Sequence, residues 1–237
     1  MKLIKSIVVT VFCIITLISS CAVFNTVKFL SLPTNSSAEF VNKVIIDAGH
    51  GGFDGGAVAV DGTAEKDINL NIALLIGEML EFSGYEVIYT RTDDKGTESN
   101  SNASISKRKV SDMKNRLMLM EKHADGIFVS VHLNKFTSSS VAGAQVFYSP
   151  NFIEAKNISD EIQNSIVSLV QPNNKRTVKQ GSASTFLLKN AKVPAVIVEC
   201  GFLSNEEELK LLKTTDYQKQ IAFAVYCGIL NYKRSLL

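Results

Sequence analysis

The sequence predicts an α/β domain with a single mixed, mostly parallel sheet and helices on both faces. Three observations predict it. Short apolar runs alternate along the chain with longer amphipathic stretches, and such alternation is typical of strands and helices in α/β domains. Several of the apolar runs break at glycine or at small polar residues, as strands do. The composition, 46% hydrophobic and 20% charged over 237 residues, suits one globular domain with a sizeable core.

The first half of the domain supplies two predicted strands and two predicted helices. Residues 43–47 form the first strand and residues 85–90 the second. Between them, a helix over residues 65–82 is indicated by an apolar stripe of Ile68, Ile72, Leu75 and Met79. The Ser/Asn-rich residues 92–109 are predicted to be an exposed loop. The helix after this loop carries the regularly spaced core residues Val110, Met113, Leu117 and Met120.

The second half repeats the alternation. Predicted strands cover residues 126–132, 144–148 and 195–199. Helices are expected at about residues 152–170 and 216–232. The polar residues 171–184 are expected to line or cover a groove. No internal repeat is found.

The N-terminus predicts export or anchoring. Lys2 and Lys5 precede an uncharged run from Ile7 to Phe24, whose length lies between a signal core and a full membrane span. Three outcomes stay open for residues 1–30: a retained anchor, which we favour, a cleaved signal, or a lipoprotein signal with lipidated Cys21. Residues 31–42 are predicted to be a linker, and residues 43–237 a catalytic domain outside the membrane.

The charge distribution and the cysteines indicate which partners and which disulfide bonds to expect. The formal net charge is +2, and the three lysines of the first thirty residues leave the remainder without a basic field, which argues against a nucleic-acid partner. Cys200 and Cys227 are the two cysteines of the predicted domain. We expect two buried free thiols, with a bridge between them as the alternative.

Two histidines end apolar runs and suggest a metal site. His50 closes KVIIDAGH before the loop GGFDGG, and His132 closes GIFVSVH. Glu65 opens the first helix, and Glu199 ends PAVIVE. Strand ends at one sheet edge bring such side chains together, and two imidazoles with a carboxylate are a ligand set of hydrolytic zinc. Taken singly, each residue has a structural explanation; His123, at a predicted helix C-terminus, is interpreted as structural.

Four segments together carry a family resemblance. These are VIIDAGHGGFDGGAV, EKDINLNIA, KNRLMLMEKHAD running into GIFVSVHLNK, and VPAVIVECGFLSNEEE. They resemble, in order and over about residues 43–233, the zinc-dependent N-acetylmuramoyl-L-alanine amidases of the third amidase family. One departure is Ala48, where that family usually has proline; we expect it to change only loop stiffness.

The resemblance implies a zinc-exopeptidase-like fold and specific roles. Zn²⁺ would be held by His50, Glu65 and His132, and Glu199 would be the catalytic acid/base. Candidate supporting or substrate-contacting positions are Asp47, which could orient a ligand or the loop, Asn134 and Arg116.

The resemblance also implies a substrate and a setting. The expected reaction is hydrolysis of the amide between the muramic acid lactyl group and L-alanine in peptidoglycan. The short build is most like the CwlD-type spore-cortex and germination amidases, where this cleavage permits muramic δ-lactam formation. We therefore expect a cell-envelope location, membrane association through the N-terminal segment, and an accessory envelope protein or lipoprotein as partner. A zinc exopeptidase and a non-catalytic wall-binding scaffold remain the alternatives.

Overall fold

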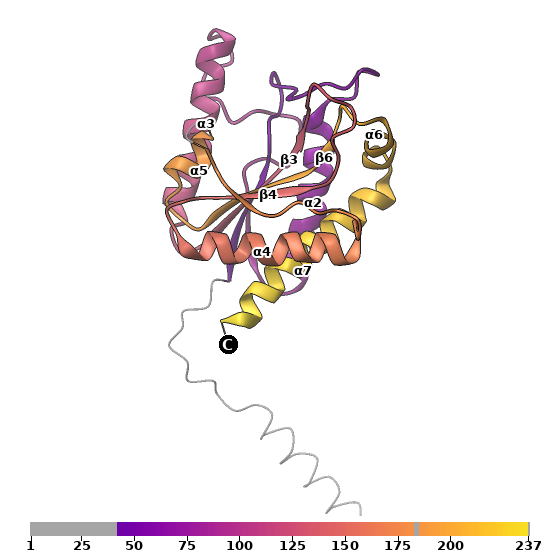
Figure 1. Ribbon diagram of the computed structural model, residues 1–237. Helices are drawn as coiled ribbons and strands as arrows, with labels where there is room; N and C mark the ends of the chain where they lie inside the picture. Colours follow the sequence, from indigo (N-terminus) through magenta and orange to yellow (C-terminus); the bar gives the residue numbers. More distant parts are fainter. Residues whose placement is uncertain (1–41, 183–184, 237) are drawn as a thin grey trace, which may run out of the picture. The chain divides into compact units, whose positions relative to one another are not determined.

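The computed structural model describes residues 42–182 and 185–236, which build one six-stranded sheet covered by helices (Figure 1). The predicted N-terminal anchor or signal, its Cys21, and the linker as far as residue 41 lie outside the described residues. Within the part that is described, no helix has both the length and the apolar character needed to span a bilayer.

The sheet has the strand order β2-β1-β3-β6-β4-β5. Its strands are β1 (Lys43–Ala48), β2 (Glu86–Tyr89), β3 (Ile127–Asn134), β4 (Gln145–Tyr148), β5 (Lys179–Gln180) and β6 (Ala195–Phe202). Pairing is parallel throughout except between β4 and β6, which run antiparallel. The predicted mixed, mostly parallel sheet is therefore confirmed.

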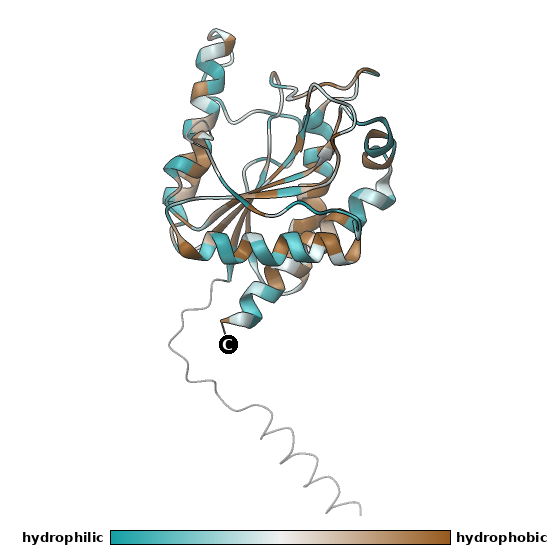
Figure 2. Ribbon diagram, viewed as in Figure 1, coloured by the Kyte–Doolittle hydropathy of each residue, from teal (hydrophilic) through white to brown (hydrophobic). Residues whose placement is uncertain are grey.

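Helices cover both faces of the sheet, as the sequence predicts. One face packs against α2 (Glu65–Phe82), α4 (Ile153–Leu169) and α7 (Thr215–Ser235), around buried residues such as Ile72, Val129 and Ile162. The other packs against α3 (Ile105–Lys122) and α5 (Phe186–Asn190), around Phe128 and Leu188. Figure 2 shows strands that are largely brown, and so apolar, and helices along which apolar and polar residues alternate. Burying one such large side chain stabilises the fold by roughly 1.5–3 kcal/mol.

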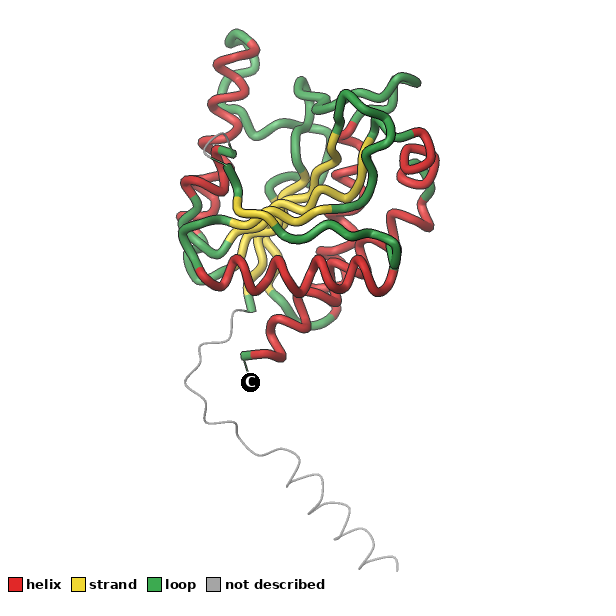
Figure 3. The backbone as a smooth tube through the Cα atoms, viewed as in Figure 1, coloured by secondary structure: helices red, strands yellow, loops and turns green. Residues whose placement is uncertain are grey.

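The alternation of side chains along the central strands separates the core from the site. Val131 and Val198 point into the core shared with α2, α4 and α7. Their neighbours His132 and Glu199 are register partners on β3 and β6 and lie on the opposite face. Figure 3 shows the yellow strands side by side in one twisted sheet. The parallel strands β1, β3 and β6 thus bring their carboxyl ends to one edge.

Several boundaries differ from the sequence-based expectation. Helix α3 begins at Ile105, so residues 105–109 are helical and not loop. These residues are mostly polar and exposed, so they carry no apolar period to reveal the helix. Strands β3 and β6 continue beyond His132 and Glu199. The short elements β5, α5 and α6 (Glu206–Leu212) were not predicted, because they span at most seven residues.

Both cysteines of the domain are free thiols. Cys200 is buried in the core, and Cys227 is half-buried on α7. Since adjacent residues of a strand face opposite sides, Cys200 points away from the face that carries Glu199. Burial also raises the pKa of the Cys200 thiol, which keeps it protonated and unreactive.

Candidate metal centre

Three side chains from separate elements meet at the carboxyl end of β1 and β3. His50 follows β1, Glu65 is the first residue of α2, and His132 lies on β3; one ligand atom from each falls within 4.8 Å of the others. Glu65 lies between the imidazoles, with Oε1 3.0 Å from His132 Nδ1 and Oε2 3.3 Å from His50 Nε2. The two rings are edge to face, 5.0 Å apart. These are the three residues that the sequence analysis proposes as ligands.

The backbone of His50 is held in an unusual conformation by two arginines. Its φ is 62°, in the left-handed region that only glycine adopts readily. Arg116 donates to the carbonyls of His50 (2.7 Å) and Ala48 (3.0 Å). Arg91 donates to the carbonyls of Ala48 (2.9 Å) and Gly49 (3.1 Å). The surrounding structure thereby fixes a turn that would cost about 1–3 kcal/mol on its own.

Two buried carboxylates compensate Arg116. Its guanidinium pairs with Asp47 and, at 2.8 Å, with Asp112. Asp47 also accepts hydrogen bonds from Ser130 and Thr90. Burial raises the pKa of Asp47, but the charge of Arg116 and the hydrogen bonds from Ser130 and Thr90 together hold that pKa below its usual value. Asp47 therefore contacts the group that holds the loop, and within the described residues it makes no contact with a ligand imidazole.

Asp54 supplies the imidazole contact that sequence analysis did not assign. Its Oδ2 lies 2.9 Å from His50 Nδ1, and its Oδ1 lies 3.0 Å from Lys109 Nζ. A carboxylate on the outer ring nitrogen is the usual way to orient a metal-binding histidine. Burial lowers the pKa of His50, but hydrogen bonds to Asp54 and Glu65 outweigh it and raise that pKa to about 9. In the sequence, the one signal for Asp54 was its position four residues after His50 in the glycine loop.

Glu65 is surrounded by donors that set its orientation. Oε1 accepts from Asn69 Nδ2 (3.1 Å) and from the backbone N–H of Leu133 (3.0 Å). Oε2 accepts from the backbone N–H of Ala57 (2.8 Å). Burial raises the pKa of Glu65, but hydrogen bonds from both histidines prevail and hold it well below its usual value. Glu65 therefore stays ionised, as a metal ligand must. Asn69, one helical turn from Glu65, is a second supporting residue that sequence analysis missed.

Glu199 is the unsatisfied group of the centre. It lies opposite His132 on β6, and its buried Oε2 has no hydrogen-bond partner among the described residues. Burial raises the pKa of Glu199 to about 6, although attraction to His132 opposes the shift. An orphaned buried carboxylate with a pKa near neutrality is typical of a catalytic acid/base.

Two glycines make room for the ligands. A Cβ on Gly49 would lie 2.3 Å from the His132 ring. A Cβ on Gly56, whose φ is 69°, would lie 2.6 Å from both Glu65 Oε2 and His50 Cδ2. Any larger residue at either position would displace a candidate ligand.

The remaining predicted residues have local roles. Asn134 ends β3; its Oδ1 accepts from the backbone N–H of Lys135 (2.8 Å) and its carbonyl from Leu203 (2.8 Å). Arg116, as described, contacts the backbone carbonyls of His50 and Ala48. His123 is the C-cap residue of α3, outside the centre.

The donor set fits zinc. Two imidazoles and one carboxylate leave a coordination position open for water, and structural zinc sites usually have four protein ligands instead. The oriented outer nitrogen of His50 and the orphaned oxygen of Glu199 fit the same assignment.

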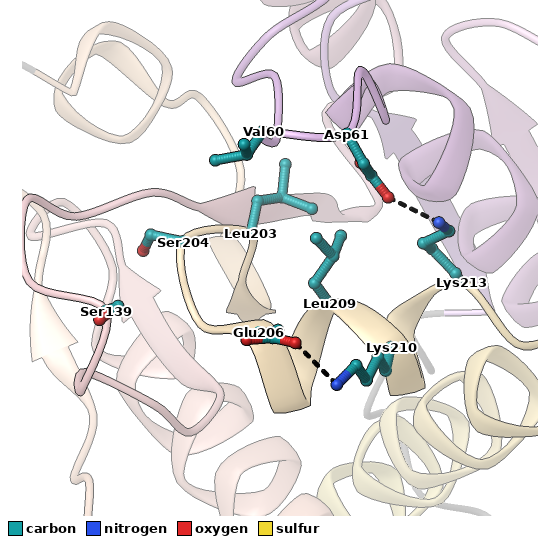
Figure 4. A pocket seen from close by; sticks show the side chains of 9 residues that line it. All are labelled: Val60, Asp61, Ser139, Leu203, Ser204, Glu206, Leu209, Lys210 and Lys213. Carbon is teal, nitrogen blue, oxygen red and sulfur yellow. Dashed lines mark hydrogen bonds and ion pairs between the residues drawn. The ribbon is translucent and has the colours of Figure 1, made fainter.

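A separate cavity of about 580 Å³ lies where the residue 57–64 loop faces α6 (Figure 4). Its walls include the apolar Val60, Leu203 and Leu209. The charges around it pair with each other, Asp61 with Lys213 at 2.6 Å and Glu206 with Lys210 at 2.8 Å. None of the candidate ligands lines it, so the cavity offers apolar contact and not catalytic chemistry.

Known proteins share this sequence and fold. The family model described as N-acetylmuramoyl-L-alanine amidase (Amidase_3) matches residues 44–231. The germination-specific N-acetylmuramoyl-L-alanine amidase of Bacillus subtilis (strain 168) is 34% identical over 189 residues, covering 80% of this chain and 78% of the relative.

Solved structures agree with these sequence matches. The CwlD amidase from Clostridioides difficile, solved in complex with the GerS lipoprotein, superposes with a TM-score of 0.78 at 42% identity, over 82% of this chain and 99% of the other. The catalytic domain of the amidase CwlV from Bacillus (Paenibacillus) polymyxa var. colistinus gives 0.65 at 30% identity, over 80% and 97%. By its family match, its relatives and its fold, the chain belongs to the N-acetylmuramoyl-L-alanine amidase family Amidase_3.

Proposed function

We propose that this protein is a zinc-dependent N-acetylmuramoyl-L-alanine amidase that hydrolyses the amide between the muramic acid lactyl group and L-alanine in peptidoglycan. The observation that carries the proposal is the buried Oε2 of Glu199, which has no partner among the described residues and belongs to the register partner of His132, a member of the cluster of His50, Glu65 and His132. Such an arrangement supplies both a metal site and a proton carrier for amide hydrolysis. Family membership supports the choice of bond.

Three residues would bind the metal, and two further residues would orient them. His50, Glu65 and His132 would hold the metal, with Asp54 and Asn69 fixing two of them. When bound, zinc supplies a water that ionises near neutral pH and a positive charge beside the scissile carbonyl. Glu199 lies across from His132 in the sheet register, which brings its carboxylate to the same edge as the candidate ligands.

Glu199 moves the proton. As a carboxylate it accepts a proton from the attacking water while the water oxygen bonds to the lactyl carbonyl carbon. It then gives that proton to the L-alanine nitrogen as the C–N bond breaks. The products are a lactyl carboxylate and a free L-alanine amine. The pKa of about 6 suits both directions of transfer near neutral pH.

We further infer a role in spore-cortex peptidoglycan at the cell envelope, where the cleavage permits δ-lactam formation. The similarity to a germination-specific amidase supports this role. We also infer a membrane-proximal location through residues 1–30 and an envelope lipoprotein as partner, supported by the lipoprotein complex of the similar CwlD amidase. Affinity purification of the full chain from sporulating-cell membranes should recover a lipoprotein; recovery of the amidase alone would count against the partner.

Mass spectrometry of digested peptidoglycan tests the reaction. The purified full chain is incubated with peptidoglycan, with zinc and after chelation. We expect zinc-dependent release of muramic lactyl carboxyls and L-alanine N-termini. Glu199→Gln should bind zinc like the wild type but cleave at least 100-fold more slowly, since it cannot carry the proton.

The same digest separates the alternatives. Cleavage between amino acids, with the lactyl amide intact, would replace the amidase by a zinc exopeptidase. Absence of cleavage by a folded, zinc-loaded chain would favour a wall-binding scaffold and contradict the proposal.

A further inference from the structure

Gln145 is the cross-strand neighbour of Glu199. The antiparallel register of β4 and β6 pairs these two residues directly, so their side chains share the face that carries the candidate centre. Gln145 is buried, and its Nε2 donates to the carbonyl of Thr177 at 2.7 Å. It thereby connects the catalytic end of β6 to the polar segment that follows α4.

Arg176 is held in place on this neighbour. Its Nη1 donates to Gln145 Oε1 (3.0 Å) and its Nε to the carbonyl of Ala142 (2.8 Å). Its guanidinium carbon also lies 4.8 Å from the centre of the Phe202 ring. Two hydrogen bonds and a cation–π contact fix an arginine side chain that would otherwise be mobile.

The third nitrogen of this guanidinium remains available. Nη2 of Arg176 has no hydrogen-bond partner in residues 42–182 and 185–236, and the side chain forms no ion pair there. The neighbouring carboxylate of Glu208 is occupied, since it accepts the backbone N–H groups of Gly143 (2.9 Å) and Phe202 (2.8 Å). Arg176 is therefore a half-buried, oriented cation with one unused donor group.

The surroundings of Arg176 suit an anionic peptide. The chain has no acidic residue between Glu161 and Glu199, and this stretch carries five cations: Lys175, Arg176, Lys179, Lys189 and Lys192. Arg176 and Lys175 also line a cavity of about 640 Å³, in which Glu208 is the acidic residue; as in the first cavity, none of the candidate ligands lines it. Positive charge on the chain beside a cavity attracts anions and raises their local concentration.

We propose that Arg176 binds the free carboxylate of the stem-peptide residue that follows L-alanine, and that the enzyme therefore prefers stems in which this carboxylate is present. The inference rests on the proposed amidase function. L-alanine and the next residue together span roughly 7 Å of chain. In the sheet, Gln145 pairs with Glu199 and accepts from Arg176 at 3.0 Å, so a single side chain separates Arg176 from the candidate proton carrier. The unused Nη2 can donate to a carboxylate oxygen, and a carboxamide lacks the negative charge that strengthens this bond.

The test uses two synthetic muramoyl peptides that differ at one group. In one, the second stem residue is D-glutamate linked through its γ-carboxyl, with a free α-carboxylate; in the other, that group is a carboxamide. We expect the zinc-loaded full chain to show a kcat/KM about tenfold or more higher for the carboxylate, which is the range of charge-assisted hydrogen bonds. Arg176→Gln should bring the ratio close to one by slowing only the carboxylate substrate.

Two further variants separate binding from folding. Arg176→Lys keeps the charge but loses the planar guanidinium that Gln145 and Ala142 hold, and it should give an intermediate ratio. Lys175→Gln removes the same charge from the adjacent, exposed residue and should keep the wild-type ratio. Equal cleavage of both peptides by the wild type, or equal loss on both with Arg176→Gln, would overturn the inference while leaving the amidase intact. Cleavage of neither peptide by the wild type would contradict the proposed function as well.

Discussion

At the residue scale, His50 shows how a strained backbone indicates function. Its positive φ would be easier for glycine or asparagine, yet only an imidazole offers a ring nitrogen to a metal while the other nitrogen contacts Asp54. The candidate ligands could be proposed from the sequence because His50 and His132 end apolar runs and Glu65 opens the first helix. The supporting roles of Asp54 and Asn69 could not be predicted, because the sequence does not reveal the direction of a side chain in a loop or on a helix.

The pKa of Glu199 predicts the pH profile. Burial raises this pKa to about 6, so the carboxylate that accepts a proton is lost as the pH falls through that value. At saturating zinc, kcat/KM should fall about tenfold per pH unit below about 6. Glu199→Gln should show a slow rate without this acidic limb. If the limb persists in the variant, it belongs to another group.

Gly49 predicts a steric loss of metal binding. Gly49→Ala would place a Cβ 2.3 Å from the His132 ring, so the ring must move away from its partners. Zinc affinity, measured by competition with a chromophoric chelator, should fall at least tenfold, within the range expected for changes around metal ligands. Gly55→Ala is the matched control, because its Cβ would meet only Val58 at 3.9 Å. Equal affinities for the two variants would contradict the crowding argument.

At the element scale, the loop between β1 and α2 is held by side chains from other elements. Arg116 comes from α3, and Arg91 follows β2. The first turns of α3 also contact the glycine loop, with Arg108 3.9 Å from the centre of the Phe53 ring and Lys109 on Asp54. Residues 105–109, expected as loop, therefore belong to the site's support. Residues 105–109 have the polar, exposed sequence of a loop because this part of α3 packs against the glycine loop and not against the apolar core.

Removing the charge of Arg116 tests this support. Arg116→Met leaves Asp47 and Asp112 buried without their cation, and the free energy of unfolding should fall by about 3–5 kcal/mol in urea titrations. Lys210→Met removes another ion pair spaced by four residues on a helix, but an exposed one, and should leave stability unchanged within error. Similar small losses for both would show that Arg116 does not hold the loop.

At the scale of the whole molecule, the sheet collects the candidate site from distant parts of the chain. The fold class could be predicted, because the apolar runs and helical stripes are local patterns. The strand order could not, because β6 lies between β3 and β4 and its pairing is non-local. Phe202 and Gln145 reach the site through this pairing, which explains why neither carries a sequence signal for it.

Zinc should stabilise the whole domain. The candidate ligands join the β1 end, α2 and β3, so a metal bound only by the folded chain adds to its stability. At free zinc one hundred times its Kd, the gain should be about 2.7 kcal/mol, seen as a higher Tm that chelation reverses. His132→Ala should abolish the zinc-dependent shift, whereas Glu199→Gln should keep it. A shift in the absence of His132 would place the metal elsewhere.

The position of β6 has a consequence for when activity can arise. A chain that has emerged only as far as residue 194 already contains all three candidate ligands, but it lacks the strand that joins β3 to β4 and brings Glu199 opposite His132. Pairing of β6 therefore completes the sheet and the hydrolytic group in the same event. The order of emergence from the N-terminus therefore delays peptidoglycan cleavage until the domain is almost fully synthesised.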